Sequence, residues 1–142
     1  MFIDYHRLVS NLKRHEGLRL KVYQCSANKN TIGYGRNLDD VGISEVEAEV
    51  LLKGDIQVAM NELLSLDEFR RVMNPLRREV LINMRFNLGM SRLMGFVKMW
   101  QAIDDENWEA ASKEMLDSLW AKQVGSRATE LAEQMRTGVN HE

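Results

Sequence analysis

Residues 15–35 read HEGLRLKVYQCSANKNTIGYG and place three chemically active side chains at close intervals: Glu16, Cys25 and Thr31. Glu16 stands directly before Gly17, a glycine placed to end a helix, so its carboxyl group is expected at a helix C-terminus. The helix macrodipole disfavours a carboxylate at that end and favours the protonated form. Glu16 is therefore a candidate general acid, and a solvated helix end is the alternative.

The same segment changes to a period of two at its centre. Residues 18–23 alternate between apolar and polar side chains, which predicts a half-buried strand. SANKN then supplies turn residues, with Asn28 and Asn30 able to adopt left-handed backbone conformations. TIGYG predicts a second short strand, so the segment forms a hairpin. At residues 35–38 a third short strand and a loop are alternatives.

A hairpin of this kind can bring Cys25 and Thr31 together, one from each strand. If Glu16 points across the sheet, the three side chains enclose a gap for a water molecule and a scissile bond. Cys25 has two other interpretations, a small buried apolar residue and a nucleophilic thiolate paired with a histidine. The chain's histidines are His6, His15 and His141. They are scattered and lack helical i, i+4 spacing, so no metal site is predicted.

The composition is that of an ordinary globular protein. The chain has 142 residues, a formal net charge of −2 and 44% hydrophobic residues, which fits one domain with a sizeable core. The near-neutral charge argues against a nucleic-acid partner, because phosphate binding requires an excess of Lys and Arg. The single cysteine excludes an intramolecular disulfide. Charged residues interrupt the N-terminal apolar residues, so neither an export signal nor a membrane span is predicted.

Helical periodicity accounts for most of the remaining chain. Ser44 and Glu47 form an S-x-x-E capping box at the start of a long helix that could connect two lobes. Pro75 follows Asn74 as a first-turn proline follows its N-cap. The predicted helices span residues 2–15, 45–64, 75–88, 95–104, 108–120 and 127–137. The predicted fold class is therefore α+β, mainly helical, with a small sheet near the N-terminus.

The 15–35 segment resembles the catalytic signature of the phage-type lysozymes of glycoside hydrolase family 24. That signature is an acidic residue, eight others, Asp or Cys, five others, then Thr, and its positions here are Glu16, Cys25 and Thr31. Later stretches resemble the T4-like branch of the family: EAEVLLKGDIQVAMNELL, LINMRFNLGMSRLMGF and NWEAASKEMLDSLWAKQVGSRATELAEQMRTG. The resemblance covers nearly the whole chain.

The resemblance implies a two-lobed lysozyme-like fold within a single domain, residues 1–142. The sheet-bearing N-terminal lobe would span about residues 14–55 and the helical C-terminal lobe about residues 65–142. The helix over residues 2–15 would pack on the C-terminal lobe. The glycan would bind in the cleft between the lobes.

The resemblance also implies an activity, hydrolysis of the β-1,4 bond between N-acetylmuramic acid and N-acetylglucosamine in peptidoglycan. Glu16 would be the general acid and Thr31 would position the attacking water. Cys25 stands where the family more often has aspartate, and its role as base, nucleophile or hydrogen-bond partner to the water stays open. Arg127 corresponds to an arginine that holds the acidic residue and meets acidic groups of the peptide stem. The further substrate contacts expected are Tyr34, Gly35 and Asn87.

Two expectations concern charged side chains. The resemblance pairs Arg36 with Asp55 on the long helix, and an exposed ion pair of this kind contributes little to stability. Many lysozymes of this type are strongly basic, so this slightly acidic chain should be steered to the anionic wall less strongly. Residual attraction is expected from a basic cluster: Arg70, Arg71, Arg77 and Arg78.

These inferences predict a monomeric phage or prophage endolysin that needs no cofactor and whose partner is bacterial peptidoglycan. It would be made in the host cytoplasm and act on the wall in the periplasm after a holin permeabilises the membrane. Two alternatives stay open, a wall-binding homologue with weak or no turnover and a lytic transglycosylase, which forms a 1,6-anhydro product.

Overall fold

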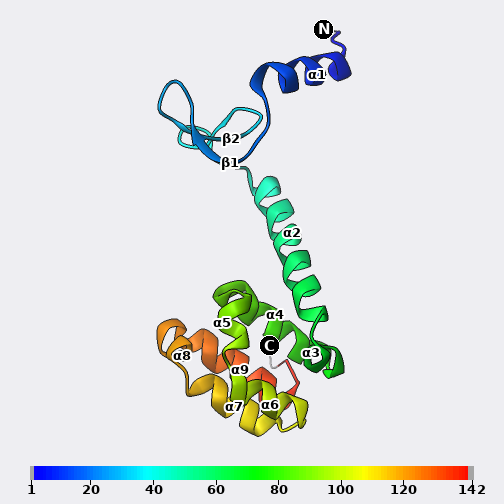
Figure 1. Ribbon diagram of the computed structural model, residues 1–142, viewed down its shortest axis with the longest axis vertical. Helices are drawn as coiled ribbons and strands as arrows, with labels where there is room; N and C mark the ends of the chain where they lie inside the picture. The colour runs from blue at the N-terminus through cyan, green and yellow to red at the C-terminus, as the bar shows by residue number, and fades with distance from the viewer. Residues whose placement is uncertain (1, 141–142) are drawn as a thin grey trace. The chain divides into compact units, whose positions relative to one another are not determined.

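The computed structural model describes residues 2–140. They form two compact units, which divide between Val50 and Leu51. The first unit holds a helix and a three-stranded antiparallel sheet, and the described part of the second is built of helices (Figure 1). The long helix α2 (Glu45–Leu64) begins in the first unit and continues into the second. The predicted class, α+β and mainly helical, is confirmed.

Helix α1 (Tyr5–Glu16) carries the candidate acid at its last position. It begins where Asp4 caps it, because the Asp4 carboxylate accepts a hydrogen bond from the backbone N–H of Arg7 at 3.0 Å. It ends at Gly17, whose φ of 73° is one that glycine adopts without steric cost. The helix therefore begins later than the predicted residue 2, and Glu16 closes it as expected.

The sheet has the order β1-β2-β3. Its strands are β1 (Arg19–Gln24), β2 (Asn30–Gly33) and β3 (Arg36–Asn37). The predicted hairpin is confirmed, with Tyr23 opposite Thr31, and the third short strand is present. Asn28 has the left-handed φ of 60° that the turn requires, and its N–H donates to the Cys25 carbonyl at 2.8 Å. Asn30 instead begins β2.

The prediction that β1 is half-buried is wrong. Leu20 is 80% exposed and Val22 is 55% exposed. Among the described residues of the first unit, only Thr31 is buried. A unit of this size has too little chain to enclose an apolar core of its own. Hydrogen bonds and turn geometry therefore define the shape of this unit.

Helix α2 has the predicted bounds, and its predicted capping box is formed. The Ser44 N–H donates to Oε1 of Glu47 at 2.9 Å, and the Glu47 N–H donates to Oγ of Ser44 at 3.1 Å. Two backbone donors that the first turn cannot satisfy internally are thereby paired.

The second unit continues from α2 through a series of shorter helices. They are α3 (Asp67–Arg71), α4 (Pro75–Leu88), α5 (Met90–Met94), α6 (Val97–Asp104), α7 (Trp108–Leu116), α8 (Leu119–Val124) and α9 (Ser126–Thr137). The bounds predicted for α4 are confirmed, and α9 begins one residue before its predicted start. Helices α3 and α5 were not predicted, because a single turn leaves no helical periodicity in the sequence.

Two predicted helices have different bounds in the structure. The helix predicted over residues 108–120 is divided into α7 and α8, because Ser118 starts a new helix. Its hydroxyl accepts a hydrogen bond from the Ala121 N–H at 3.1 Å. The helix predicted over residues 95–104 begins at Val97, because Phe96 has a non-helical ψ of 57°.

The core of the second unit lies where α4, α6, α7 and α9 pack on one another. Leu81, Met84, Met99 and Met115 are fully buried there. Trp100 is buried with its indole N–H donating to the Leu93 carbonyl at 3.0 Å, so the ring adds apolar area without an unpaired donor. This core gives the candidate substrate contacts on α4 and α9 a rigid support.

The arginines predicted as a basic cluster are engaged within the second unit. They are Arg70, Arg71, Arg77 and Arg78. The first two pair with carboxylates, those of Asp67 and Asp104. The other two donate to main-chain carbonyls at helix ends, including that of Met135 at 2.7 Å. Their main observed role is to fix the ends of helices.

Candidate active site

The Glu16 carboxyl group lies against the turn that joins β2 to β3. A methyl group built on Gly35 would lie 2.6 Å from Oε2 and 3.1 Å from Cδ of Glu16. Gly35 also has a φ of 79°, in the region that L side chains rarely adopt. Both the close approach of Glu16 and the positive φ therefore favour glycine at this position. The structure brings together the candidate acid and the predicted contact residue Gly35.

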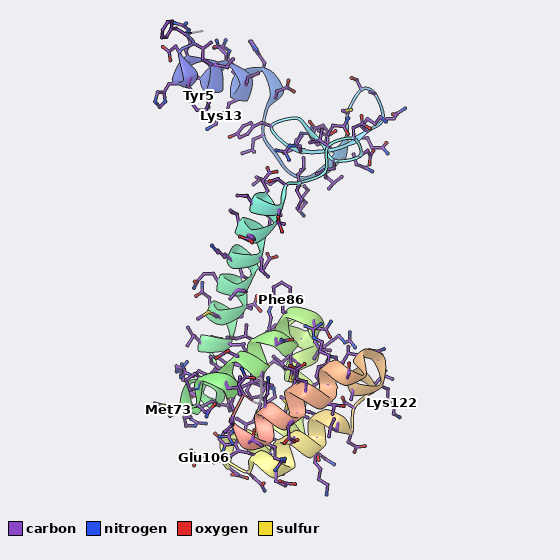
Figure 2. The ribbon with its side chains drawn as sticks, turned by 180° about the vertical axis from the view of Figure 1, so that it is seen from behind. Tyr5, Lys13, Met73, Phe86, Glu106 and Lys122 are labelled. Atoms are coloured by element: carbon purple, nitrogen blue, oxygen red, sulfur yellow. The ribbon has the colours of Figure 1, made fainter. Side chains whose placement is uncertain are left out.

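A second contact joins the end of α1 to the same turn. The Lys13 ammonium lies 5.4 Å from the centre of the Tyr34 ring, within cation–π range. Lys13 is labelled on α1 in Figure 2 and stands about one turn before Glu16. The last turn of α1 is thus held on residues 34 and 35 by two side chains. Lys13 was not predicted as part of the site, since a lone lysine on a helix carries no sequence signal.

Cys25 stands where the hairpin turn begins. Its N–H donates to the Lys29 carbonyl at 3.0 Å. The pKa of its thiol is lowered, chiefly by a hydrogen bond from the backbone N–H of Lys29, then by that of Ala27 and by the Thr31 hydroxyl. Burial raises this pKa to a smaller extent. Donors around the sulfur favour the thiolate, the form that can accept a proton.

Thr31 meets Cys25 across the hairpin. It is 3% exposed, and its hydroxyl donates to the Lys29 carbonyl at 2.8 Å. A hydroxyl has one proton, so it cannot donate to that carbonyl and to the Cys25 sulfur at once. The backbone N–H groups are therefore the constant cause of the lowered thiol pKa. Cys25 and Thr31 are brought together at one end of β2, as the hairpin prediction required.

Glu16 lies against Gly35, in the turn that follows β2. The first unit thus presents an acid on the turn after β2 and a thiol–hydroxyl pair near the start of β2. That the three side chains enclose a gap for a water molecule and a scissile bond stays a prediction.

The predicted ion pair of Arg36 with Asp55 is wrong, because Glu47 takes the guanidinium. The Arg36 guanidinium donates to both carboxylate oxygens of Glu47, at 2.9 and 2.8 Å, and to the Gly42 carbonyl at 3.0 Å. Glu47 is already oriented by Ser44. The pKa of Glu47 is lowered to about 2, first by Arg36 and then by Ser44. This pair ties β3 to the start of α2.

In the second unit, Arg127 is held by a residue that the sequence interpretation missed. The Arg127 guanidinium donates from Nε and Nη2 to Oδ1 of Asn83, at 3.1 and 2.6 Å. Both line an apolar groove of about 630 Å³ between α2 and α4. The predicted role of Arg127 in holding Glu16 stays a prediction.

Asn87 lies one turn after Asn83 on α4 and is fixed in a similar way. Its Oδ1 accepts a hydrogen bond from the Trp120 indole N–H at 2.7 Å. The amide NH₂ is therefore the part of Asn87 that is oriented to donate to a ligand. The spacing of the two asparagines in NMRFN indicates one helix face. The partner Trp120, far along the chain, could not be inferred from that spacing.

Three further expectations concern metal ligands, membrane spans and a histidine partner for Cys25. Within residues 2–140 no group of three His, Cys, Asp or Glu side chains could hold a metal ion. No described helix is long and apolar enough to cross a membrane. Neither His6 nor His15 is among the groups that change the Cys25 pKa, and His141 lies outside the described residues.

Comparison with known proteins gives a consistent set of relatives. The family model of phage lysozymes matches residues 13–136. A probable T4-type lysozyme 1 of Dictyostelium discoideum is 26% identical, over 89% of this chain and 92% of that protein. An endolysin of Acyrthosiphon pisum secondary endosymbiont phage 1 is 32% identical, over 82% of this chain and 80% of that protein. An endolysin of Salmonella phage P22 is 31% identical, over 80% of each.

Proposed function

Because this chain belongs to the phage lysozyme family, we propose that it hydrolyses the β-1,4 bond between N-acetylmuramic acid and N-acetylglucosamine in bacterial peptidoglycan. The coarser assignment, a lysozyme-type cell-wall hydrolase, follows from the family and its endolysin relatives. The observation that carries the finer proposal is the contact of Glu16 with Gly35, because it fixes a carboxyl group at one point of the sheet.

Glu16 is the general acid of the proposed reaction. A general acid must keep one position while the leaving oxygen approaches, since small misplacements are costly in rate. The Gly35 contact and the adjacent Lys13–Tyr34 contact supply that positioning. The glycosidic C–O bond breaks as the proton of Glu16 passes to the leaving oxygen.

Cys25 and Thr31 act on the water. A water oxygen forms the new bond to the anomeric carbon, and its proton passes to the Cys25 thiolate or to solvent. The lowered pKa of Cys25 supports this role, because it increases the thiolate fraction. Thr31 positions the water through its hydroxyl oxygen. In this reaction the water attacks directly, so no covalent intermediate with the protein forms.

The remaining site residues bind substrate. Tyr34 and Gly35 border the acid in the first unit, where their backbone and ring are available to a sugar. Asn87 offers its amide NH₂ to a carbonyl such as that of an N-acetyl group. Arg127 keeps Nη1 outside its bonds to Asn83, so the guanidinium retains donors for an acidic group.

The biological setting proposed is that of an endolysin. The protein acts on the wall as a monomer, reaching it from the host cytoplasm through a holin-dependent membrane lesion. The endolysin relatives support peptidoglycan as the partner.

Clearing of permeabilised Gram-negative cells tests the proposal. The wild type should lower the turbidity, and Glu16→Gln should reduce the rate by about 10²–10⁴-fold, because the amide cannot donate a proton in the same way. A wild type that sediments with walls but never clears them would indicate a wall-binding homologue. Full clearing by Glu16→Gln would remove Glu16 from its assigned role.

A further inference from the structure

Thr31 is enclosed by the residues that face it across the sheet. It is 3% exposed, while no other described residue of the first unit is buried. The residues directly opposite it are Tyr23 on β1 and Asn37 on β3. In antiparallel strands such residues point to the same face, with their Cβ atoms about 5 Å apart. We call this row of Tyr23, Thr31 and Asn37 the hydroxyl row.

Asn37 forms one side of the hydroxyl row and is fixed by the loop after β3. Its amide NH₂ donates to the Asp40 carboxylate at 2.9 Å, and its Oδ1 accepts a hydrogen bond from the Asp40 N–H at 3.0 Å. Both ends of the amide are engaged with Asp40. This side of the row is therefore held in place.

Tyr23 forms the other side through its ring. The Arg19 guanidinium lies 5.0 Å from the centre of that ring, within cation–π range. Arg19 is exposed and pairs with no carboxylate among the described residues, so the ring is the group that orients it. The Tyr23 hydroxyl makes no hydrogen bond within residues 2–140. Tyr23 therefore contributes its ring, and not its hydroxyl, to the row.

Cys25 lies beside the hydroxyl row. It follows Tyr23 by two residues, a spacing that puts side chains on the same face of an extended chain. Its thiol is half-buried, and the Thr31 hydroxyl is one of the groups that lower the pKa of this thiol. The Tyr23 ring is thus the neighbour of both groups that act on the water in the proposed reaction.

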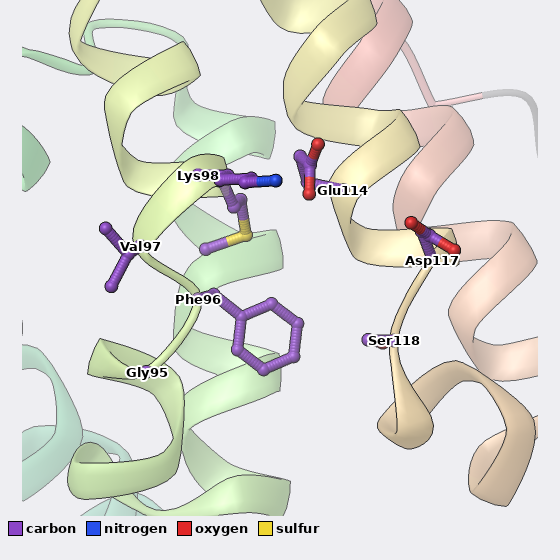
Figure 3. Close-up of a pocket in the computed structure, with 8 residues that line it drawn as sticks. Gly95, Phe96, Val97, Lys98, Glu114, Asp117 and Ser118 are labelled. Carbon is purple, nitrogen blue, oxygen red and sulfur yellow. The ribbon is translucent and has the colours of Figure 1, made fainter.

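Ser118 on the second unit shows how differently a hydroxyl lies beside an open hollow. Its hydroxyl donates to a main-chain carbonyl, that of Met115, at 2.6 Å. It lines a hollow of about 400 Å³ between the start of α6 and the end of α7 (Figure 3), so solvent reaches it from that hollow. Thr31 makes the same kind of bond, to the Lys29 carbonyl, but its neighbours close it off from bulk water.

We propose that Tyr23 is a positioning residue, whose ring, held by Arg19, keeps bulk water away from Thr31 and Cys25. This inference rests on the proposed function, in which those two side chains act on one water. Solvent that reached the Thr31 oxygen would compete with that water for its hydrogen bonds. A shielded hydroxyl and thiol hold the attacking water in one position, which is where the rate is gained.

Initial rates on purified peptidoglycan test the effect on the reaction. Tyr23→Ala should lower kcat by about ten- to a hundredfold with little change in KM, because the water and not the glycan is misplaced. Tyr23→Phe should restore kcat, since it keeps the ring. Val22→Ala is the matched control, because Val22 is the next residue on the other face of β1 and is 55% exposed. Equal kcat values for Tyr23→Ala and Val22→Ala would overturn the proposal.

The thiol gives a measurement that does not depend on turnover, because Cys25 is the only cysteine of the chain. The rate of alkylation by iodoacetamide, at a pH that ionises the thiol, reports how open this side chain is. Arg19→Leu should raise the rate about two- to fivefold, the range of an exposed cation–π contact, and Tyr23→Ala should raise it further. Tyr23→Phe and Val22→Ala should leave it unchanged.

Arg19 is exposed, so Arg19→Leu keeps the fold and carries the test even where Tyr23→Ala does not fold. Unchanged alkylation in Arg19→Leu and in folded Tyr23→Ala would overturn the proposal. A wild type that cleaves no peptidoglycan would instead overturn the proposed function, while the alkylation rates still decide whether the ring covers the thiol.

Discussion

At the level of single residues, the position of the Glu16 carboxyl group depends on a glycine. Gly33 and Gly35 both have positive φ, at 70° and 79°, so an alanine strains the backbone at either position. Only at Gly35 would the new methyl group meet the Glu16 carboxyl, because nothing lies within 4 Å of the same group on Gly33. The pair therefore separates backbone strain from displacement of the acid.

We expect Gly35→Ala to lower kcat by roughly ten- to a hundredfold more than Gly33→Ala does, since the Glu16 carboxyl must move to admit the methyl group. Initial rates on purified peptidoglycan check this, with thermal unfolding confirming that both variants fold. Equal rates for the two variants would mean that the Gly35 contact does not position the acid.

Cys25 gives a second prediction at this scale. Alkylation with a bulky reagent should abolish activity, and Cys25→Asp should retain it, because a carboxylate can also accept the proton of the water. The acidic limb of the pH–rate profile should move to lower pH in Cys25→Asp, since a carboxyl ionises at lower pH than a thiol. Full activity after alkylation would remove Cys25 from the mechanism.

At the scale of elements, the ion pair of Arg36 with Glu47 joins β3 to α2. The pKa of Glu47 is lowered from 4.5 to about 2, because the folded structure stabilises the carboxylate form of this side chain. This contribution to stability is complete above pH 4.5 and is lost as the pH falls towards 2. Tyrosine fluorescence reports on the first unit, because the three tyrosines all lie there and the three tryptophans lie in the second unit.

The free energy of unfolding, measured in urea by tyrosine fluorescence, should therefore decrease as the pH falls from 4.5 towards 2. Glu47→Gln should be less stable at neutral pH and should lack this part of the pH dependence. Identical pH profiles for wild type and variant would contradict the role given to Glu47.

Much of the element order could be predicted from the sequence, and the failures have physical causes. The capping box at Ser44 and the proline at position 75 are local sequence signals of helix starts, so the bounds of α2 and α4 could be predicted. The boundary between α7 and α8 depends on the hydroxyl of Ser118, which caps α8. A serine is also common on the exposed face within a helix, so its presence alone does not indicate a helix start. The exposure of β1 depends on how little chain surrounds it, which alternation alone cannot reveal.

For the candidate site, the sequence indicates the residues of the local motif but not the partners of its charged side chains. Glu16, Cys25 and Thr31 follow from a local motif within one hairpin and one helix end. The choice of Glu47 rather than Asp55 for Arg36, and of Asn83 for Arg127, depends on which side chains reach each other in space. Such pairings between distant positions have no local sequence signal.

At the scale of the whole molecule, the single domain over residues 1–142, with its lobes at about 14–55 and 65–142, stays a prediction. It includes the proposal that the helix over residues 2–15 packs on the C-terminal lobe. Leu12→Lys should then lower the free energy of unfolding, followed by tryptophan fluorescence, by about 1–3 kcal/mol. Ser10→Lys, on another face of α1, is the control and should have little effect. Equal transitions for the two variants would contradict this packing.

The masses of the muropeptides released from purified peptidoglycan in isotopically labelled water identify both the bond that is cleaved and the way it is cleaved. We expect fragments that end in a reducing N-acetylmuramic acid with one labelled oxygen at its anomeric carbon, because water completes the cleavage. Fragments ending in an unlabelled 1,6-anhydro sugar would contradict hydrolysis, and a reducing N-acetylglucosamine end would contradict the bond assigned.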